Sequence, residues 1–191
     1  MTHATLPVRL DAEAAARAFR RPRARNLFGL LRPRPVSQSP DGQPASLELV
    51  WMPAYAFRVA LSRGTRRSDS WVSVDASYGG FALFDRLGEL KEQEPEGAVF
   101  EPVLDAHAAE KLAREGLVRY ILRRRGAKPD IDSVEEVRLY YAPVWVYYVR
   151  RIGRKIDLAV RDGYTGDPMG GRVRVAVLNA FIREREAGRS G

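Results

Sequence analysis

An internal repeat constrains this sequence more than any other feature. Short groups of residues near the N-terminus recur in the second half of the chain, and the spacing between equivalent residues shortens twice. Both changes fall where loops are expected, in the Pro-rich segment 32–46 and in the basic turn 63–70, as two related folded units would show. The equivalent residues are Leu10, Asp11 and Ala12 with Leu104, Asp105 and Ala106; Ala14 and Ala15 with Ala108 and Ala109; Leu49, Pro53 and Val59 with Leu139, Pro143 and Val149; and Val72 and Val74 with Leu158 and Val160.

Each repeat contains a long segment in which apolar residues occupy every second position. In the first repeat these positions run from Leu47 to Leu61, and in the second from Val137 to Val149. Alternation with a period of two over this length predicts a β-strand with one buried face. Pro53 and Pro143 occupy equivalent places in the two strands. Because proline cannot donate a ladder hydrogen bond, we predict a structural bend that both repeats share.

Alanine-rich segments precede both strands and predict helices at 10–20 and 105–125, with Asp11 suited to the first turn of the former. Further strands are expected at 70–76, 80–85 and 155–161. The end of the chain, 172–185, fits strand and helix patterns alike, and a strand that runs into a short terminal helix is favoured. The sequence thus predicts an α+β fold of two tandem repeats, each an Ala-rich helix followed by an antiparallel sheet of about three strands. The predicted division is 1–85, an acidic linker 86–102, and 103–191.

A short motif after the return strand of each repeat carries a family resemblance. Residues 162–167 read Asp-Gly-Tyr-Thr-Gly-Asp, and residues 75–80 read Asp-Ala-Ser-Tyr-Gly-Gly, a weaker match. With the order helix, long strand and return strand, the motif resembles the end of the PepSY domain, a small α+β module. The resemblance implies a non-enzymatic role, often outside the cytoplasm. Many β-turns favour Asp early and Gly late, so an unrelated cystatin-like or other α+β repeat remains the alternative.

No pattern in the sequence indicates catalysis, a cofactor or a metal. Cysteine is absent, which excludes disulfides, Cys-type zinc sites and thiol chemistry. The two histidines, His3 and His107, have no further ligand at metal spacing, and no phosphate-binding P-loop is present. No apolar run suggests a signal peptide or a membrane span. We therefore expect a non-enzymatic protein without a cofactor, located in the cytoplasm.

Four apolar residues are candidates for binding a protein partner. Tyr140, Val144, Val146 and Tyr148 lie between the alternating apolar positions of the second long strand, which makes both faces of that strand apolar. Such a strand must be covered on both sides, by the other repeat, by a helix or by a partner chain. Open sheet edges also invite an added strand, from another protein or from a second copy.

Arginine clusters at two corresponding hairpin turns are candidates for binding an anion. The formal net charge of the chain is +8, and the clusters are either solvated turns or contacts for an anionic partner such as nucleic acid. No helix-turn-helix, RNP or KH pattern is present. Our first hypothesis is therefore a protein-binding or scaffold protein that includes self-association through an open sheet edge, and the alternative is a basic nucleic-acid-binding protein. The clustered residues are Arg63, Arg66 and Arg67, and Arg150, Arg151 and Arg154.

Overall fold

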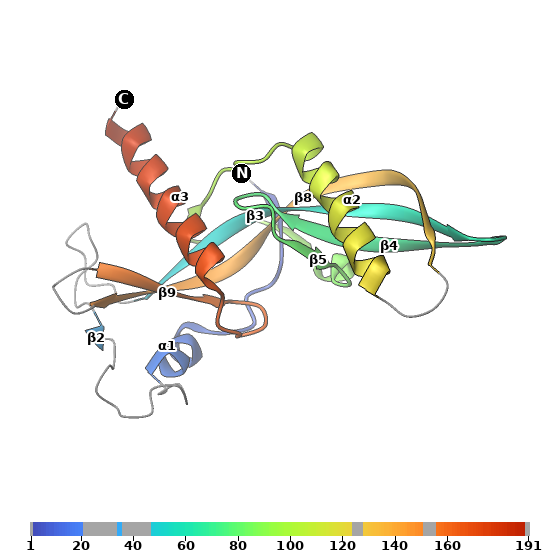
Figure 1. Cartoon of the computed structure of the whole chain (residues 1–191). Helices are drawn as coiled ribbons and strands as arrows, with labels where there is room; N and C mark the ends of the chain where they lie inside the picture. Colours follow the sequence, from blue (N-terminus) through green and yellow to red (C-terminus); the bar gives the residue numbers. More distant parts are fainter. Residues whose placement is uncertain (1, 21–33, 36–46, 124–127, 151–155, 190–191) are drawn as a thin grey trace. The chain divides into compact units, whose positions relative to one another are not determined.

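The protein has an α+β fold, described by a computed structural model for residues 2–20, 34–35, 47–123, 128–150 and 156–189. These residues form three α-helices and nine strands of one mostly antiparallel sheet (Figure 1). The chain divides into two compact units. Two long strands, β3 (Leu47–Arg63) and β8 (Asp130–Arg150), contribute residues to both units.

The first unit is a sheet with one helix packed on it. It comprises Met1–Leu6, Met52–Pro95 and Val99–Ala142, and its strands follow the order β5–β4–β3–β8–β1–β6. β1 lies parallel to β8, whereas β4 pairs antiparallel with both β3 and β5. The remaining elements are β1 (His3–Thr5), β4 (Arg66–Asp75), β5 (Phe81–Leu83), the short 3-10 helix η1 (Leu87–Glu89), β6 (Lys91–Gln93) and α2 (Ala106–Arg123).

Small side chains on one face of α2 allow the helix to lie close to the sheet. Ala109, Ala113 and Leu117 recur at every fourth position, so they share one helix face. All three are buried against apolar side chains of β3 and β4. The carboxylate of Asp105 begins the helix by accepting a hydrogen bond from the backbone N–H of Ala108 at 2.7 Å. The strand residues of this core are Phe57, Val59, Val72 and Val74.

The second unit is a strand hairpin with a helix on each face. It comprises Pro7–Trp51, Glu96–Ala98 and Pro143–Gly191, and β9 (Ile156–Asp162) pairs antiparallel with β8. On one face, Phe19 of α1 (Ala12–Arg20) stacks on Tyr147 with ring centroids 4.9 Å apart. Tyr148 points to the opposite face, where its ring lies 6.4 Å from Phe181 of α3 (Gly171–Arg189).

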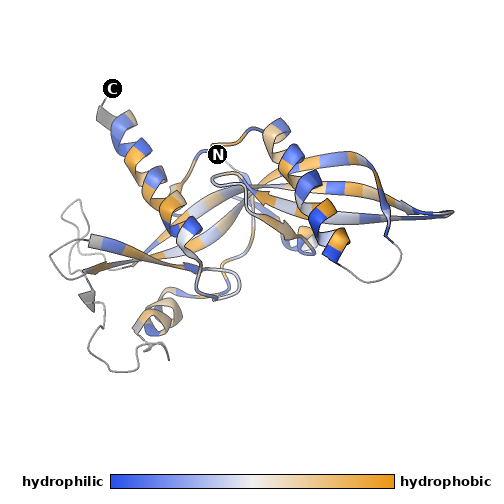
Figure 2. Cartoon of the chain, in the orientation of Figure 1, coloured by the Kyte–Doolittle hydropathy of each residue, from blue (hydrophilic) through white to orange (hydrophobic). Residues whose placement is uncertain are grey.

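Two short strands complete the sheet. β2 (Arg34–Pro35) pairs antiparallel with the end of β8, and β7 (Ala98–Val99) pairs with β3. Helices α2 and α3 carry hydrophilic and hydrophobic residues in alternating bands, as expected for helices that cover one face of a sheet (Figure 2).

The two units contain the same set of backbone hydrogen bonds around a turn aspartate. In the second unit, Gly163 follows Asp162, donates its N–H to the carbonyl of Pro143 and accepts the N–H groups of Arg9 and Leu10. Ala76, which follows Asp75 in the first unit, has equivalent bonds with Pro53, Val103 and Leu104. Gly79 and Gly166 close the two turns with positive φ angles of 74° and 81°, a conformation that favours glycine. These bonds attach each helix to its hairpin.

The two units do not coincide with the predicted ranges 1–85 and 103–191. The helix of the first predicted repeat, α1, lies in the second unit with β8 and β9, and α2 lies in the first unit with β3 and β4. Each unit therefore combines the helix of one predicted repeat with the hairpin of the other. The predicted acidic linker 86–102 contributes to both units, and it holds the strand β6 and the buried ring of Phe100.

The end of the chain is helical from Gly171, so the favoured prediction of a strand running into a helix was wrong. Val173, Ala176, Val177 and Ala180 are buried. Their spacing forms one helix face, and packing of that face outweighs the strand preference of the alternating valines.

We expect Gly116→Ala to destabilise the protein although alanine favours helices. A Cβ atom at this position would clash with ring atoms of Phe81 and lie 2.9 Å from its Cβ. Overpacking of this kind costs about 1–3 kcal/mol, which exceeds the gain of about 1 kcal/mol in helix propensity. Urea unfolding would measure the loss, with the exposed neighbour Glu115→Ala as a control that shifts stability by less than about 0.5 kcal/mol. Equal stability of Gly116→Ala and wild type would contradict this packing.

Candidate functional site

The four apolar candidates of the second long strand are buried within the chain itself. The exposed fractions of Tyr140, Val144, Val146 and Tyr148 are 5%, 1%, 0% and 4%. The hydroxyl of Tyr140 hydrogen-bonds to the Ser73 hydroxyl at 2.8 Å. These side chains are therefore not accessible to a partner, and the apolar character of both strand faces is explained by packing inside the protein.

The arginine cluster of the β3–β4 hairpin lies on the surface. Arg63, Arg66 and Arg67 are all exposed around the turn Gly64–Thr65, and none of them forms an ion pair in the part of the chain that the structure describes. Figure 1 shows this hairpin reaching past the ends of β5 and α2.

The second predicted cluster lies largely outside the described residues. Arg151 and Arg154 fall within 151–155, which the structure does not describe, and of Arg150 only its backbone place at the end of β8 is described.

The β4 edge offers backbone hydrogen-bonding groups to an added strand. The short strand β5 pairs only with Val72–Val74 of β4, and the N–H of Phe84 bonds to the carbonyl of Trp71 at 2.9 Å. In the described chain, no strand lies beside Arg66–Ser70 on this side. Since alternate residues of a strand face the same neighbour, the N–H and C=O groups of Arg67 and Asp69 point outward with those of Trp71.

The β9 edge, by contrast, is closed by contacts within the chain. The N–H of Leu158 donates to the carboxylate of its neighbour Asp157 at 2.8 Å, and Arg174 of α3 pairs with the other oxygen of that carboxylate at 3.2 Å. The N–H of Met169 bonds to the carbonyl of Val160 at 3.0 Å. A charged side chain folded over an edge strand blocks the addition of another strand.

The polar face of the first unit is organised around Arg58. Its guanidinium lies 3.3 Å from Glu135, 3.6 Å from Glu136 and 3.8 Å from Asp69. These side chains are partly exposed, so the network orients the surface more than it stabilises the fold. Asp69 therefore lies on the same face as Arg58, beside the open edge.

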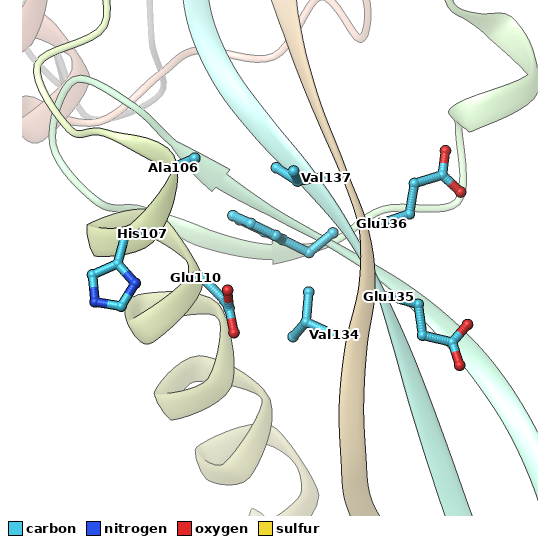
Figure 3. Close-up of a pocket in the computed structure, with 8 residues that line it drawn as sticks. Ala106, His107, Glu110, Val134, Glu135, Glu136 and Val137 are labelled. Atoms are coloured by element: carbon cyan, nitrogen blue, oxygen red, sulfur yellow. The ribbon is translucent and has the colours of Figure 1, made fainter.

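A shallow depression of about 270 Å³ lies between α2 and β8. Figure 3 shows the His107 ring pointing away from the carboxylates of Glu135 and Glu136, with Val134 and Val137 between the helix and the strand. Among the residues that the structure describes, no group of three His, Asp or Glu side chains is arranged to hold a metal ion. The depression therefore offers no convergent polar groups for chemistry.

The turn aspartate Asp75 is the one described carboxylate whose pKa burial raises to about 6. Hydrogen bonds from the backbone N–H groups of Ser77 and Tyr78, at 2.8 and 3.1 Å, act in the opposite direction. Asp162 accepts the equivalent bonds from Tyr164 and Thr165. Both side chains hold turns together, which is the role that the sequence pattern favours.

Comparisons with protein-family models, with curated proteins and with solved structures give no match. None of the helices in the described ranges combines the length and apolar character that crossing a membrane requires.

Most of the open edge was not predicted from the sequence. Residues 63–70 were expected to form a turn, whereas β3 continues to Arg63 and β4 begins at Arg66. Ser68 and Asp69 gave no strand signal because they are polar on both faces of a ribbon that solvent surrounds. The available signal was the tight pair Gly64–Thr65, which is short enough for a two-residue hairpin loop.

We expect Asp75 to reduce stability as the pH rises. Its pKa is higher in the folded chain, about 6, than its ordinary value of 3.8, so the folded state holds the proton more tightly and stability falls between about pH 4 and 6. Relative to wild type, Asp75→Asn should gain up to roughly 3 kcal/mol between pH 4 and 7. Urea unfolding at several pH values would measure this, with the exposed Asp85→Asn as the control for lost charge. A stability difference that does not change with pH would contradict it.

Proposed function

We propose that the chain is a non-catalytic protein-binding or scaffold protein whose binding element is the open edge of β4. We further propose that it consists of two copies of one α+β unit similar to the PepSY module. The open edge is the observation that carries the function, and the shared turn geometry supports the duplication.

The duplication is supported by bonds that involve equivalent residues throughout. Pro53 and Pro143 accept the same hydrogen bond, and Asp11 and Asp105 cap their helices through the same contact, at 2.7 Å in each case. Two unrelated units would not be expected to share the same arrangement of a proline carbonyl, a turn aspartate and a helix cap. The exchange of helices between the two hairpins fits two copies whose docking surfaces are alike.

Binding by strand addition is supported by the length and position of the edge. The open part of the edge, Arg66–Ser70, spans five residues, or about 17 Å of extended chain. An added strand would bond to the N–H and C=O groups of Arg67 and Asp69, each bond contributing about 1 kcal/mol. The exposed arginines beside the edge would favour partner segments that carry acidic side chains.

Removing one outward N–H group tests this function. Extended octapeptides selected from a random library for binding to the protein should lose about tenfold or more in affinity with Asp69→Pro, which deletes a donor and adds a ring at the edge. Asp69→Ala keeps the N–H and is the matched control, expected to bind within about threefold of wild type. Calorimetry would give the affinities and circular dichroism would verify folding. Selected peptides that bind the proline variant as tightly as wild type would refute addition at this edge.

The exposed, unpaired arginines of the hairpin favour nucleic acid as the second candidate partner. If Arg63, Arg66 and Arg67 contact three phosphates, binding to duplex DNA should weaken about fortyfold between 50 and 200 mM salt. Replacing all three by serine should remove that dependence. Fluorescence anisotropy with random-sequence DNA and RNA would measure it. Weak binding that the triple variant leaves unchanged would exclude this role.

A further inference from the structure

We infer that the strand taken up by β4 is β4 of a second copy of this chain, antiparallel and centred on Ser68. This inference rests on the proposed function and specifies its partner. It is carried by three properties of the open edge: its length, the direction of its backbone groups, and the order of charges along it.

The length of the edge limits the possible registers. The hairpin turn at Gly64–Thr65 ends the edge on one side. On the other side β5 lies beside β4, where Leu83 pairs with Val72. A two-fold pair centred on Ser68 uses the whole open interval and places Arg66 of one copy opposite Ser70 of the other. A pair centred on Asp69 would place Arg67 opposite Trp71, whose carbonyl already accepts the N–H of Phe84.

The direction of the backbone groups removes the remaining registers. Arg67 and Asp69 face outward, so each must lie opposite an outward-facing residue of the other copy to form ladder hydrogen bonds. A two-fold axis between two residues would pair outward with inward positions. An axis at Arg67 would place two guanidinium groups opposite each other, and like charges in that position are destabilising.

The order of charges suits the register centred on Ser68. Arg67 and Asp69 lie two residues apart and therefore on one face of the strand, and in this register Arg67 of each copy is opposite Asp69 of the other. Two ion pairs form on either side of Ser68, whose small side chain fits the axis. Arg67 forms no ion pair within the described chain, and Asp69 lies 3.8 Å from Arg58.

Repulsion between the two Arg66 side chains is small in this arrangement. Arg66 lies opposite Ser70, and the two Arg66 residues are separated by four strand positions, about 13 Å along the strand direction. That separation exceeds the screening length of about 8 Å at physiological salt. At physiological salt the net charge of +8 therefore opposes association only weakly, and its effect grows as the salt concentration falls.

A cysteine at the axis would test the register directly, because the chain contains no cysteine of its own. Directly opposite residues that do not share hydrogen bonds have Cα atoms about 4.5 Å apart, within disulfide range. We expect the full chain with Ser68→Cys to form a covalent dimer under mild oxidation, seen on a non-reducing gel. Ser70→Cys is the matched control, since its two thiols would lie about 13 Å apart, and it should cross-link at least tenfold more slowly. Equal rates for both variants, or no cross-link in either, would overturn the register.

Exchanging the charges tests the ion pairs. Arg67→Glu and Asp69→Arg each place like charges opposite each other, so each alone should raise the dimer Kd at least tenfold. An equimolar mixture of the two variants should form a heterodimer, because both pairs are then complementary, with a Kd within about threefold of wild type. Sedimentation equilibrium measures all three. A wild-type chain that stays monomeric at several hundred micromolar, or a mixture that does not associate, would overturn the inference.

The outcomes separate this inference from the proposed function. A monomeric chain whose selected peptides still respond to Asp69→Pro would show that the edge binds a strand of another protein, so the function would stand and the inference would fail. If neither peptides nor a second copy bind at the edge, both fail. Salt-dependent nucleic-acid binding that requires the three arginines would replace both.

Discussion

In each unit, the backbone carbonyl of the residue after the turn aspartate fixes a helix to its hairpin. The internal arrangement of each unit depends on this contact. The carbonyl of Gly163 accepts two N–H groups, those of Arg9 and Leu10, just before α1 begins, and the carbonyl of Ala76 does the same for the segment before α2. The same peptide unit donates its N–H to a proline carbonyl in the long strand. Strand, turn and helix start are thereby joined at one point. Packing of Phe19 and of the α2 alanines then holds each helix against its strands.

This junction explains why most elements could be predicted from the sequence but their grouping could not. Alternation gave the long strands, and the alanine-rich segments capped by Asp11 and Asp105 gave two helices. The sequence pattern does not say which hairpin accepts which helix, because both hairpins offer the same carbonyl and both helix starts offer the same pair of N–H groups. Proximity along the chain favoured the neighbouring hairpin. The structure has the other pairing, in which both helix starts bond to the carbonyl of a turn.

The candidate site was predictable only in its charge. The charges of Arg66 and Arg67 can be recognised from the sequence alone. An open edge depends on what lies beside the strand, and for β4 that depends on where β5 ends. The two apolar faces around Val146 suggested a partner-binding site, but these side chains are buried within the chain. A strand covered by α1 on one side and by α3 on the other has the same sequence pattern as a strand covered by a partner. Burial by helices distant in the sequence cannot be distinguished from burial by another molecule until the coordinates are known.

The β9 edge is closed and the β4 edge is open, and this contrast supports a binding role for the β4 edge. In β9 the acidic residue Asp157 bends onto its own strand and is held there by Arg174, so the edge is closed. In β4 the acidic residue Asp69 lies two positions from Arg67, on one face and at a residue whose backbone groups point outward. Opposite charges at that spacing on an open strand are complementary to the same strand turned through a two-fold axis at the residue between them. A surface that only needed to stay soluble would be served by like charges along the edge. The opposite charges of Arg67 and Asp69 in β4 instead favour pairing with β4 of a second copy.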